Sequence, residues 1–221
     1  MKTKNHTLNL ILALTFSSAS IVQAQTPAPT QTPAVSPANA PAIPPVVRRV
    51  RGEITAINAT TMTVKTTAGE TVVFMLSPKL TVSEIKPIAS TDIKTGSYVG
   101  SAAMPMLDGT LQALEVLLFP EAARGTAEGH SPWDLQPQST MTNGTVTADT
   151  MTANGRSLVV RYKGQEKTLL IPNAAPLVTS VPADASILIV GANVLLNVTQ
   201  IDDKATVIRA SAGRNGFKPP M

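Results

Sequence analysis

Residues Arg51–Leu76, with the sequence RGEITAINATTMTVKTTAGETVVFML, decide the fold class of this chain. Short runs rich in threonine, valine and isoleucine alternate between apolar and polar side chains, which is the period of a β-strand with one buried face. We expect strands at residues 51–57, 61–66 and 70–76. Between the last two lies Thr67-Ala68-Gly69, where glycine supplies the positive φ that a hairpin turn needs. The stretch therefore predicts a β-sheet.

The same alternation continues along the chain. We expect strands at residues 97–103 and 110–119, with Asp108-Gly109 as the turn between them. Before these strands, Asp92–Gly96 predicts one tight helical turn that ends on a glycine. Short strands without a long helix predict an all-β protein.

The order of these features then recurs in the second half of the chain, which indicates an internal repeat. The matched pairs are Gly52–Ala56 with Gly144–Ala148, Met62–Lys65 with Leu158–Arg161, a strand end at Pro78 with one at Pro172, and Ile93–Val99 with Leu188–Val194. We expect two tandem OB-like β-barrel domains at residues 50–119 and 142–214, followed by a tail at 215–221. Closing a barrel removes most exposed strand edges. A small SH3-like barrel is the alternative topology.

The N-terminus has the features of a cleavable secretory signal. Lys2 and Lys4 precede the apolar run Leu8–Phe16, and small residues follow up to Ala24. A spanning helix needs about 20 apolar residues, and polar residues interrupt this run earlier. We therefore expect a signal peptide at residues 1–24 and cleavage near Ala24. No other stretch is apolar enough to span, so we expect no transmembrane segment in the mature chain.

Residues 25–49 are predicted to form a proline-, alanine- and threonine-rich tether without regular secondary structure. Proline favours extended polyproline II segments, and the segment has too little apolar bulk to fold.

The chain contains no cysteine. This excludes disulfides, a thiol redox role and thiolate metal sites. An exported chain without cysteine is expected in a bacterial periplasm or secreted.

The charge of the mature chain is close to balanced. Loss of Lys2 and Lys4 with the signal leaves 16 basic and 14 acidic residues. The only tight basic cluster is Arg48, Arg49 and Arg51, which is either solvated or in weak contact with an anionic lipid or polymer. Because aromatic residues are few, the stacking platforms that bind single-stranded nucleic acid are missing, and we expect no nucleic-acid partner.

Residues 120–141 form a connector of different character. Charged residues gather here, Trp133 is the only tryptophan, and His130 is the only histidine left after signal cleavage. Glycines and prolines argue against a long helix. A connector of this length without secondary structure is either functional or a linker.

The connector supplies the candidate site residues, which are Arg124, Glu128, His130, Trp133 and Asp134. Two interpretations remain open. Glu128, His130 and Asp134 could offer two oxygens and one nitrogen to a divalent metal, although one histidine without cysteine is a poor zinc set. Alternatively, Trp133 fills the gap between two barrels and the polar residues hydrogen-bond around it. We expect no resident cofactor other than such a metal.

The run Arg124–Leu135, RGTAEGHSPWDL, with Ser139–Asn143 after it, resembles a family of uncharacterised exported proteobacterial β-rich proteins. These proteins have been assigned an OB-fold-like domain of unknown function and are sometimes labelled metal-transporter components. The resemblance spans Arg51–Met221 and implies a periplasmic location and a β-rich fold, but no established activity. A permease needs several spanning helices, which this chain lacks, so the transporter label is not carried over.

The sequence therefore predicts a non-catalytic periplasmic binding or scaffolding protein. Its partner would be an envelope protein or a small ligand near the domain junction. The first alternative is a divalent-metal-binding accessory protein that uses the connector, and the second is an uncharacterised hydrolase. A hydrolase of the serine type needs a base beside its nucleophile, and no serine here lies in a glycine-flanked elbow.

Overall fold

A computed structural model describes residues 46–153 and 155–220. The described chain is all-β, as predicted, with three single-turn 3₁₀ segments and no longer helix. None of its helical segments is long and apolar enough to cross a membrane. The predicted signal peptide and tether residues 25–45 lie outside the described residues. Tether residues Arg48 and Arg49 are already part of the first strand.

The strands of the described residues form one 12-stranded sheet. They are β1 (Arg48–Ile57), β2 (Thr61–Thr66), β3 (Thr71–Pro87), β4 (Tyr98–Pro105), β5 (Leu111–Leu118), β6 (Gly129–Pro132), β7 (Thr140–Thr152), β8 (Gly155–Tyr162), β9 (Gln165–Pro172), β10 (Leu177–Ala183), β11 (Asn193–Ile201) and β12 (Lys204–Ala212). The 3₁₀ turns are η1 (Ser90–Asp92), η2 (Glu121–Ala123) and η3 (Ala185–Ile187).

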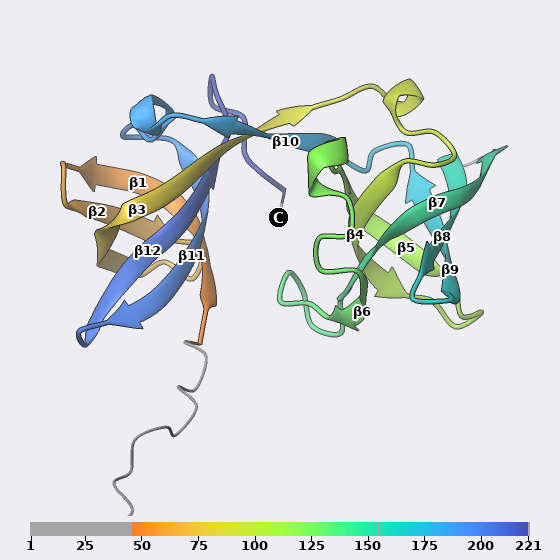
Figure 1. Cartoon of the computed structure of the whole chain (residues 1–221), viewed down its shortest axis with the longest axis horizontal. Coiled ribbons are helices and arrows are strands. Elements are labelled where there is room, and N and C mark those ends of the chain that lie inside the picture. The colour runs from red at the N-terminus through yellow and green to blue at the C-terminus, as the bar shows by residue number, and fades with distance from the viewer. Residues whose placement is uncertain (1–45, 154, 221) are drawn as a thin grey trace, which may run out of the picture. The chain divides into compact units, whose positions relative to one another are not determined.

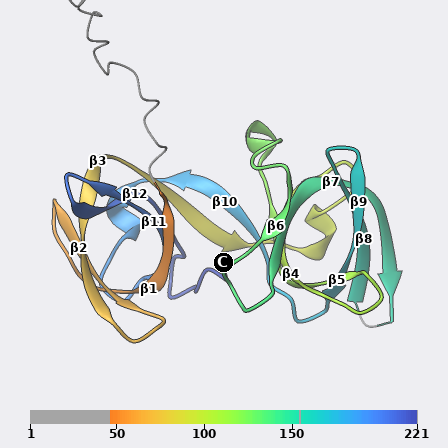
Figure 2. The ribbon, with the colours of Figure 1, turned by 90° about the horizontal axis from the view of Figure 1, so that it is seen from below.

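Strand pairing closes the sheet on itself at two places. The path β12-β11-β1-β2-β3 returns to its start through the parallel pair β12–β3, and we call this set the first ring. The path β5-β4-β7-β8-β9 returns through the parallel pair β5–β9, and we call it the second ring. Strand β10 joins the rings, because it pairs with both β3 and β5. Figures 1 and 2 show the strands of each ring gathered together, with β3 and β10 leading between them.

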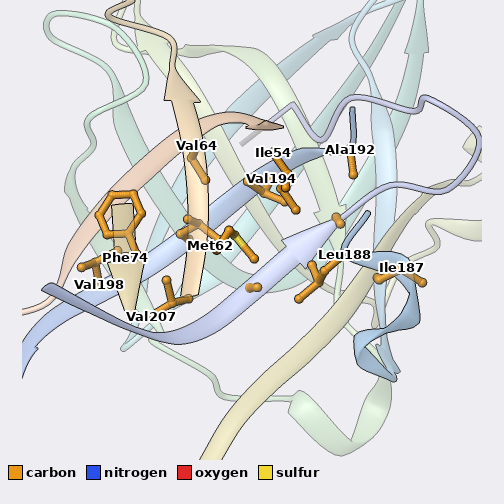
Figure 3. Close-up of a cluster of buried hydrophobic side chains, with 13 residues drawn as sticks. Ile54, Met62, Val64, Phe74, Ile187, Leu188, Ala192, Val194, Val198 and Val207 are labelled. Carbon is orange, nitrogen blue, oxygen red and sulfur yellow. The ribbon is translucent and has the colours of Figure 1, made fainter. Parts of the chain in front are cut away.

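Each ring encloses its own apolar core. In the first ring, side chains from β1, β2, β3, β11 and β12 meet residues that follow η3 (Figure 3). Their labelled members are Ile54, Met62, Val64, Phe74, Ile187, Leu188, Ala192, Val194, Val198 and Val207. The second core contains Ile93, Val99, Ala103, Leu111, Ala113, Val116, Val146, Leu158, Val160, Leu169 and Ile171. A small third cluster, Ile85, Leu117 and Val178, lies where β3, β5 and β10 meet.

The division of strands between the rings differs from the predicted order along the chain. The first ring takes β1–β3 from the predicted domain 50–119 and β11–β12 from the predicted domain 142–214. The second ring takes β4–β5 from the former range and β7–β9 from the latter. Neither core is therefore built from one of the two predicted ranges alone.

Several predicted element boundaries also change. Strand β2 occupies the predicted residues 61–66, but β3 continues past Pro78 to Pro87. The predicted helical turn at 92–96 is shifted toward the N-terminus, where η1 spans Ser90–Asp92. The connector, predicted to lack secondary structure, contains η2 and β6. Strand β6 pairs with β7, which explains how Pro132 is accommodated at the end of a short edge strand.

Two glycines at matching places in the two rings allow close strand contacts. A Cβ on Gly52 would lie 2.3 Å from the carbonyl oxygen of Lys65, and one on Gly144 would lie 2.4 Å from that of Arg161. Both separations are far shorter than van der Waals contact, so only glycine fits at these crossings.

Candidate functional site

The five candidate residues of the connector fall into three separate places. Arg124 contacts β4 and its neighbours, Glu128 and His130 line a pocket beside the β8–β9 hairpin, and Trp133 and Asp134 contact β1. Within the described residues, no group of three or more histidine, cysteine, aspartate or glutamate side chains is arranged to hold a metal ion. Glu128, His130 and Asp134 are thus not gathered into one ligand set.

Arg124 attaches the start of the connector to the second ring. Its Nη2 donates to the carbonyl oxygen of Gly96 at 2.9 Å, and its guanidinium also pairs with Glu121. The guanidinium carbon lies 5.8 Å from the ring centroid of Tyr98. The Tyr98 hydroxyl donates to the carbonyl oxygen of Thr126 at 3.1 Å. These contacts fix the path of the connector and leave Arg124 outside the pocket.

Trp133 and Asp134 bind the end of the connector to β1. The Arg49 guanidinium lies 3.8 Å from the centroid of the Trp133 ring, a cation–π contact. Arg51 donates to Oδ1 of Asp134 at 2.8 Å, and Arg49 lies 3.9 Å from Oδ2. Burial opposes ionisation of Asp134, but the hydrogen bond and charge of Arg51, helped by Arg49, hold its pKa below the ordinary value. Arg124, Glu128 and His130, which the junction interpretation placed around Trp133, make their hydrogen bonds elsewhere.

Glu128 and His130 line a pocket of about 340 Å³, which we call the His130 pocket. Its other polar walls come from Ser131 on β6 and from Tyr162, Lys163 and Gln165 at the β8–β9 hairpin. Glu128 links the connector to the β8–β9 hairpin, because its Oε1 accepts a hydrogen bond of 2.8 Å from the backbone N–H of Lys163.

His130 is held in one orientation by two neighbours. Its Nδ1 lies 2.8 Å from the hydroxyl oxygen of Thr142, and its ring stacks on Tyr162 with centroids 6.1 Å apart. Burial, assisted by the positive charge of Lys167, lowers the pKa of His130. The imidazole is therefore neutral at neutral pH. Because Nδ1 is engaged by Thr142, Nε2 is the nitrogen that a ligand would meet.

The hairpin residues of the pocket were not among the sequence candidates. Lys163 and Gly164 both have positive φ, 44° and 76°, as a two-residue hairpin turn requires. Tyr162 and Lys163 lie more than 30 residues beyond His130 in the sequence, so only strand pairing brings them together. One signal was available: the corresponding turn of the first repeat, Thr67-Ala68-Gly69, has neither an aromatic nor a basic residue.

A buried acid on β5 was also missed by the sequence analysis. Glu115 is fully buried, and neither carboxyl oxygen has a hydrogen-bond partner among the described residues. Burial raises the pKa of Glu115 to about 8, and the positive charge of Arg51 opposes that rise. Nε of Arg51 and Nε1 of Trp133 are also buried and have no hydrogen-bond partner among the described residues. Glu115 is therefore protonated at neutral pH.

Comparison with known proteins finds no matching family model, no matching curated protein and no matching solved structure.

Proposed function

We propose that this chain is a non-catalytic periplasmic binding protein that holds a small carboxylate or phosphate anion in the His130 pocket. The observation that carries this proposal is the pocket itself, because it combines two of the connector residues chosen from the sequence with a lysine-bearing hairpin. A pocket of about 340 Å³ suits a small molecule rather than a protein surface.

The charges around the pocket favour an anion. Lys163 lines it, and Lys167 lies near enough to lower the pKa of His130. The one acid in the lining, Glu128, already accepts a hydrogen bond from the Lys163 backbone. A carboxylate or phosphate group would meet lysine ammonium groups and hydrogen-bond donors such as Gln165, Ser131 and the neutral imidazole.

The surroundings of His130 support a binding role over catalysis. Its nearest hydroxyl, Thr142, would be the natural nucleophile for a histidine base. That residue is only 2% exposed, so its hydroxyl is closed to a substrate. The same burial makes Thr142 suitable for holding the imidazole in a fixed orientation for a ligand.

We also infer that the two rings arose from two copies of one OB-like unit that exchange their last two strands. Equivalent registers support this. Gly52 lies opposite Val194, as Gly144 lies opposite Val99, and both glycines approach a carbonyl oxygen of the next strand. The β3–β10 pairing, which joins the rings, runs antiparallel between corresponding segments, as expected about a pseudo-twofold axis.

Calorimetric titration tests the binding proposal. The chain without its predicted signal, residues 25–221, would be titrated with succinate, citrate and phosphate. We expect saturable binding of at least one of these anions. Lys163→Ala should weaken it about tenfold, which corresponds to about 1.4 kcal/mol.

The matched control is Lys204→Ala, because Lys204 is also an exposed hairpin lysine but lies in the turn of β11 and β12. It removes the same charge from the whole molecule and should leave affinity unchanged. Absence of saturable binding, or equal weakening by both variants, would overturn the proposal.

A further inference from the structure

Strand β1 has an open edge in the first ring. Arg48–Arg51 pair with β11 on one side. On the other side, pairing with β2 begins only at Gly52, so within residues 46–153 and 155–220 no strand covers this part of β1. Other segments also pair on one side only, such as Gln165–Thr168 of β9, but the uncovered part of β1 is set apart by its arginines.

The corresponding segment of the second ring is covered. Thr140–Asn143 of β7 pair with β4 on one side, as Arg48–Arg51 pair with β11. On their other side they pair with β6, in the register Gly129 with Asn143 through Pro132 with Thr140. The molecule itself therefore shows that this fold accepts an additional antiparallel strand at this position.

The free backbone groups of β1 can be assigned from the hydrogen bonds nearby. Ile54 donates to Ala192 and accepts from Gly191 in the direction of β11. Because successive residues of a strand alternate in direction, Arg49 and Arg51 point their backbone groups to the opposite side. There the carbonyl oxygen of Arg51 accepts from Thr67, which covers the edge at that residue, so the N–H and C=O of Arg49 face the open edge.

Side-chain charge indicates what kind of strand fits. Arg48 and Arg49 are exposed, and Arg51 is half-buried. Asp134 offsets only part of this positive charge. A neighbouring pocket of about 270 Å³, lined by Arg51, Thr67, Leu135 and Lys218 among others, adds a further cation beside the same edge.

We propose that the β1 edge at Arg48–Val50 binds an extended acidic peptide segment of a partner protein as an added antiparallel strand. Main-chain hydrogen bonds to Arg49 would supply affinity, and the arginine side chains would select acidic residues. This site is separate from the His130 pocket, so failure of one proposal would leave the other unaffected.

Calorimetry with defined peptides tests this site on residues 25–221. The probe is an end-capped hexapeptide of alternating glutamate and threonine, and the control peptide carries lysine in place of glutamate. We expect saturable binding of the acidic peptide only, weakened by added salt. Lys163→Ala should leave it unchanged, which separates this site from the His130 pocket.

Two substitutions at one position separate backbone from side-chain recognition. Arg49→Pro removes the open-edge N–H, and proline is tolerated where a strand N–H faces solvent. Arg49→Ala removes the side chain but keeps the N–H. We expect the proline variant to bind at least tenfold more weakly than the alanine variant. Equal affinities, or equal binding of both peptides to the unmodified chain, would overturn the proposal.

Hydrogen exchange provides a measurement that needs no variant. Saturating acidic peptide should slow exchange of the Arg49 amide, since it becomes a donor to the added strand. The Ile54 amide, already bonded to Ala192, should be unaffected. Unchanged exchange at Arg49 under saturating peptide would exclude strand addition at this edge.

Discussion

The first and second rings have the same strand plan but different surroundings. Both place a glycine at a crossing where a Cβ would meet a backbone carbonyl, Gly52 in one and Gly144 in the other. Only the second ring has the covering strand β6 and the lysine-bearing turn beside it. The shared glycines belong to the strand plan that closes each ring, whereas the His130 pocket is formed by residues of the second ring and the connector.

The largest expected effect concerns what the rings share. Gly52→Ala and Gly144→Ala should each destabilise the protein by about 4 kcal/mol, since the new methyl group overlaps a carbonyl oxygen that the sheet holds in place. Denaturant unfolding monitored by circular dichroism measures this. Thr55→Ala, at an exposed β1 position, is the control and should cost less than 0.5 kcal/mol. A loss of stability below about 1 kcal/mol for either variant would show that the two glycines do not have equivalent roles in the two rings.

The next effect arises where the rings differ. Glu115 lies opposite Ala102 in β4, and the corresponding pair in the first ring is Arg209 with Asn197. Because the folded-state pKa of Glu115 is raised from 4.5 to about 8, its contribution to stability is complete below pH 4.5 and is lost as pH rises toward 8. We expect the loss between pH 4.5 and pH 8 to be about 4 kcal/mol.

Glu115→Gln should remove this part of the pH dependence, so that the variant is more stable than the original chain at pH 8. Thermal unfolding between pH 4.5 and 8 measures the difference. Arg209→Gln, at the exposed counterpart, should leave the pH profile unaltered. An unchanged profile in Glu115→Gln would mean that Glu115 is ionised in the folded protein.

A smaller effect is expected at the contact between β1 and the connector. Asp134→Asn removes the ionic partner of Arg51 and should cost about 1 kcal/mol at pH 7. The pKa of Asp134 is lowered in the folded chain, so this stability is present above its ordinary value of 3.8 and is lost as pH falls below it. Glu166→Gln, which breaks the more exposed pair with Arg161, is the control and should cost less. Equal costs for the two variants in urea unfolding would show that the connector contact adds no stability of its own.

Local sequence patterns predicted the fold class but not the pairing between strands. The alternation of apolar and polar side chains at residues 61–66 predicted β2, because a two-residue period indicates a strand with one buried face. The pairing of β11 with β1 and of β12 with β3 could not be predicted this way, because strand partners far apart in sequence leave no local pattern. Pro78 predicts the end of a strand, since proline interrupts pairing. Strand β3 nevertheless continues to Pro87, and along it the neighbours change from β2 to β12 and β10.

Only part of the candidate site was predicted, because strand pairing brings together residues that lie far apart in the sequence. Unusual residues singled out the connector, and Glu128 and His130 do share a pocket. Asp134 is held away from them by Arg51, which the sequence places 83 residues earlier. The hairpin lysine of the pocket could be found only by comparing the corresponding turns of the two predicted repeats. Glu115 was hidden within an apolar strand, where a single acid gives no periodic signal.

The most direct test of the His130 pocket compares equivalent turns of the two rings in one spectrum. Uniformly ¹⁵N-labelled residues 25–221 would be titrated with citrate while backbone amide shifts are followed. We predict saturable shifts at His130, Lys163 and Gln165, and none at Thr67 in the matching turn of the first ring. Shifts spread equally over both turns, or no saturable shift at Lys163, would contradict a specific anion site in the second ring.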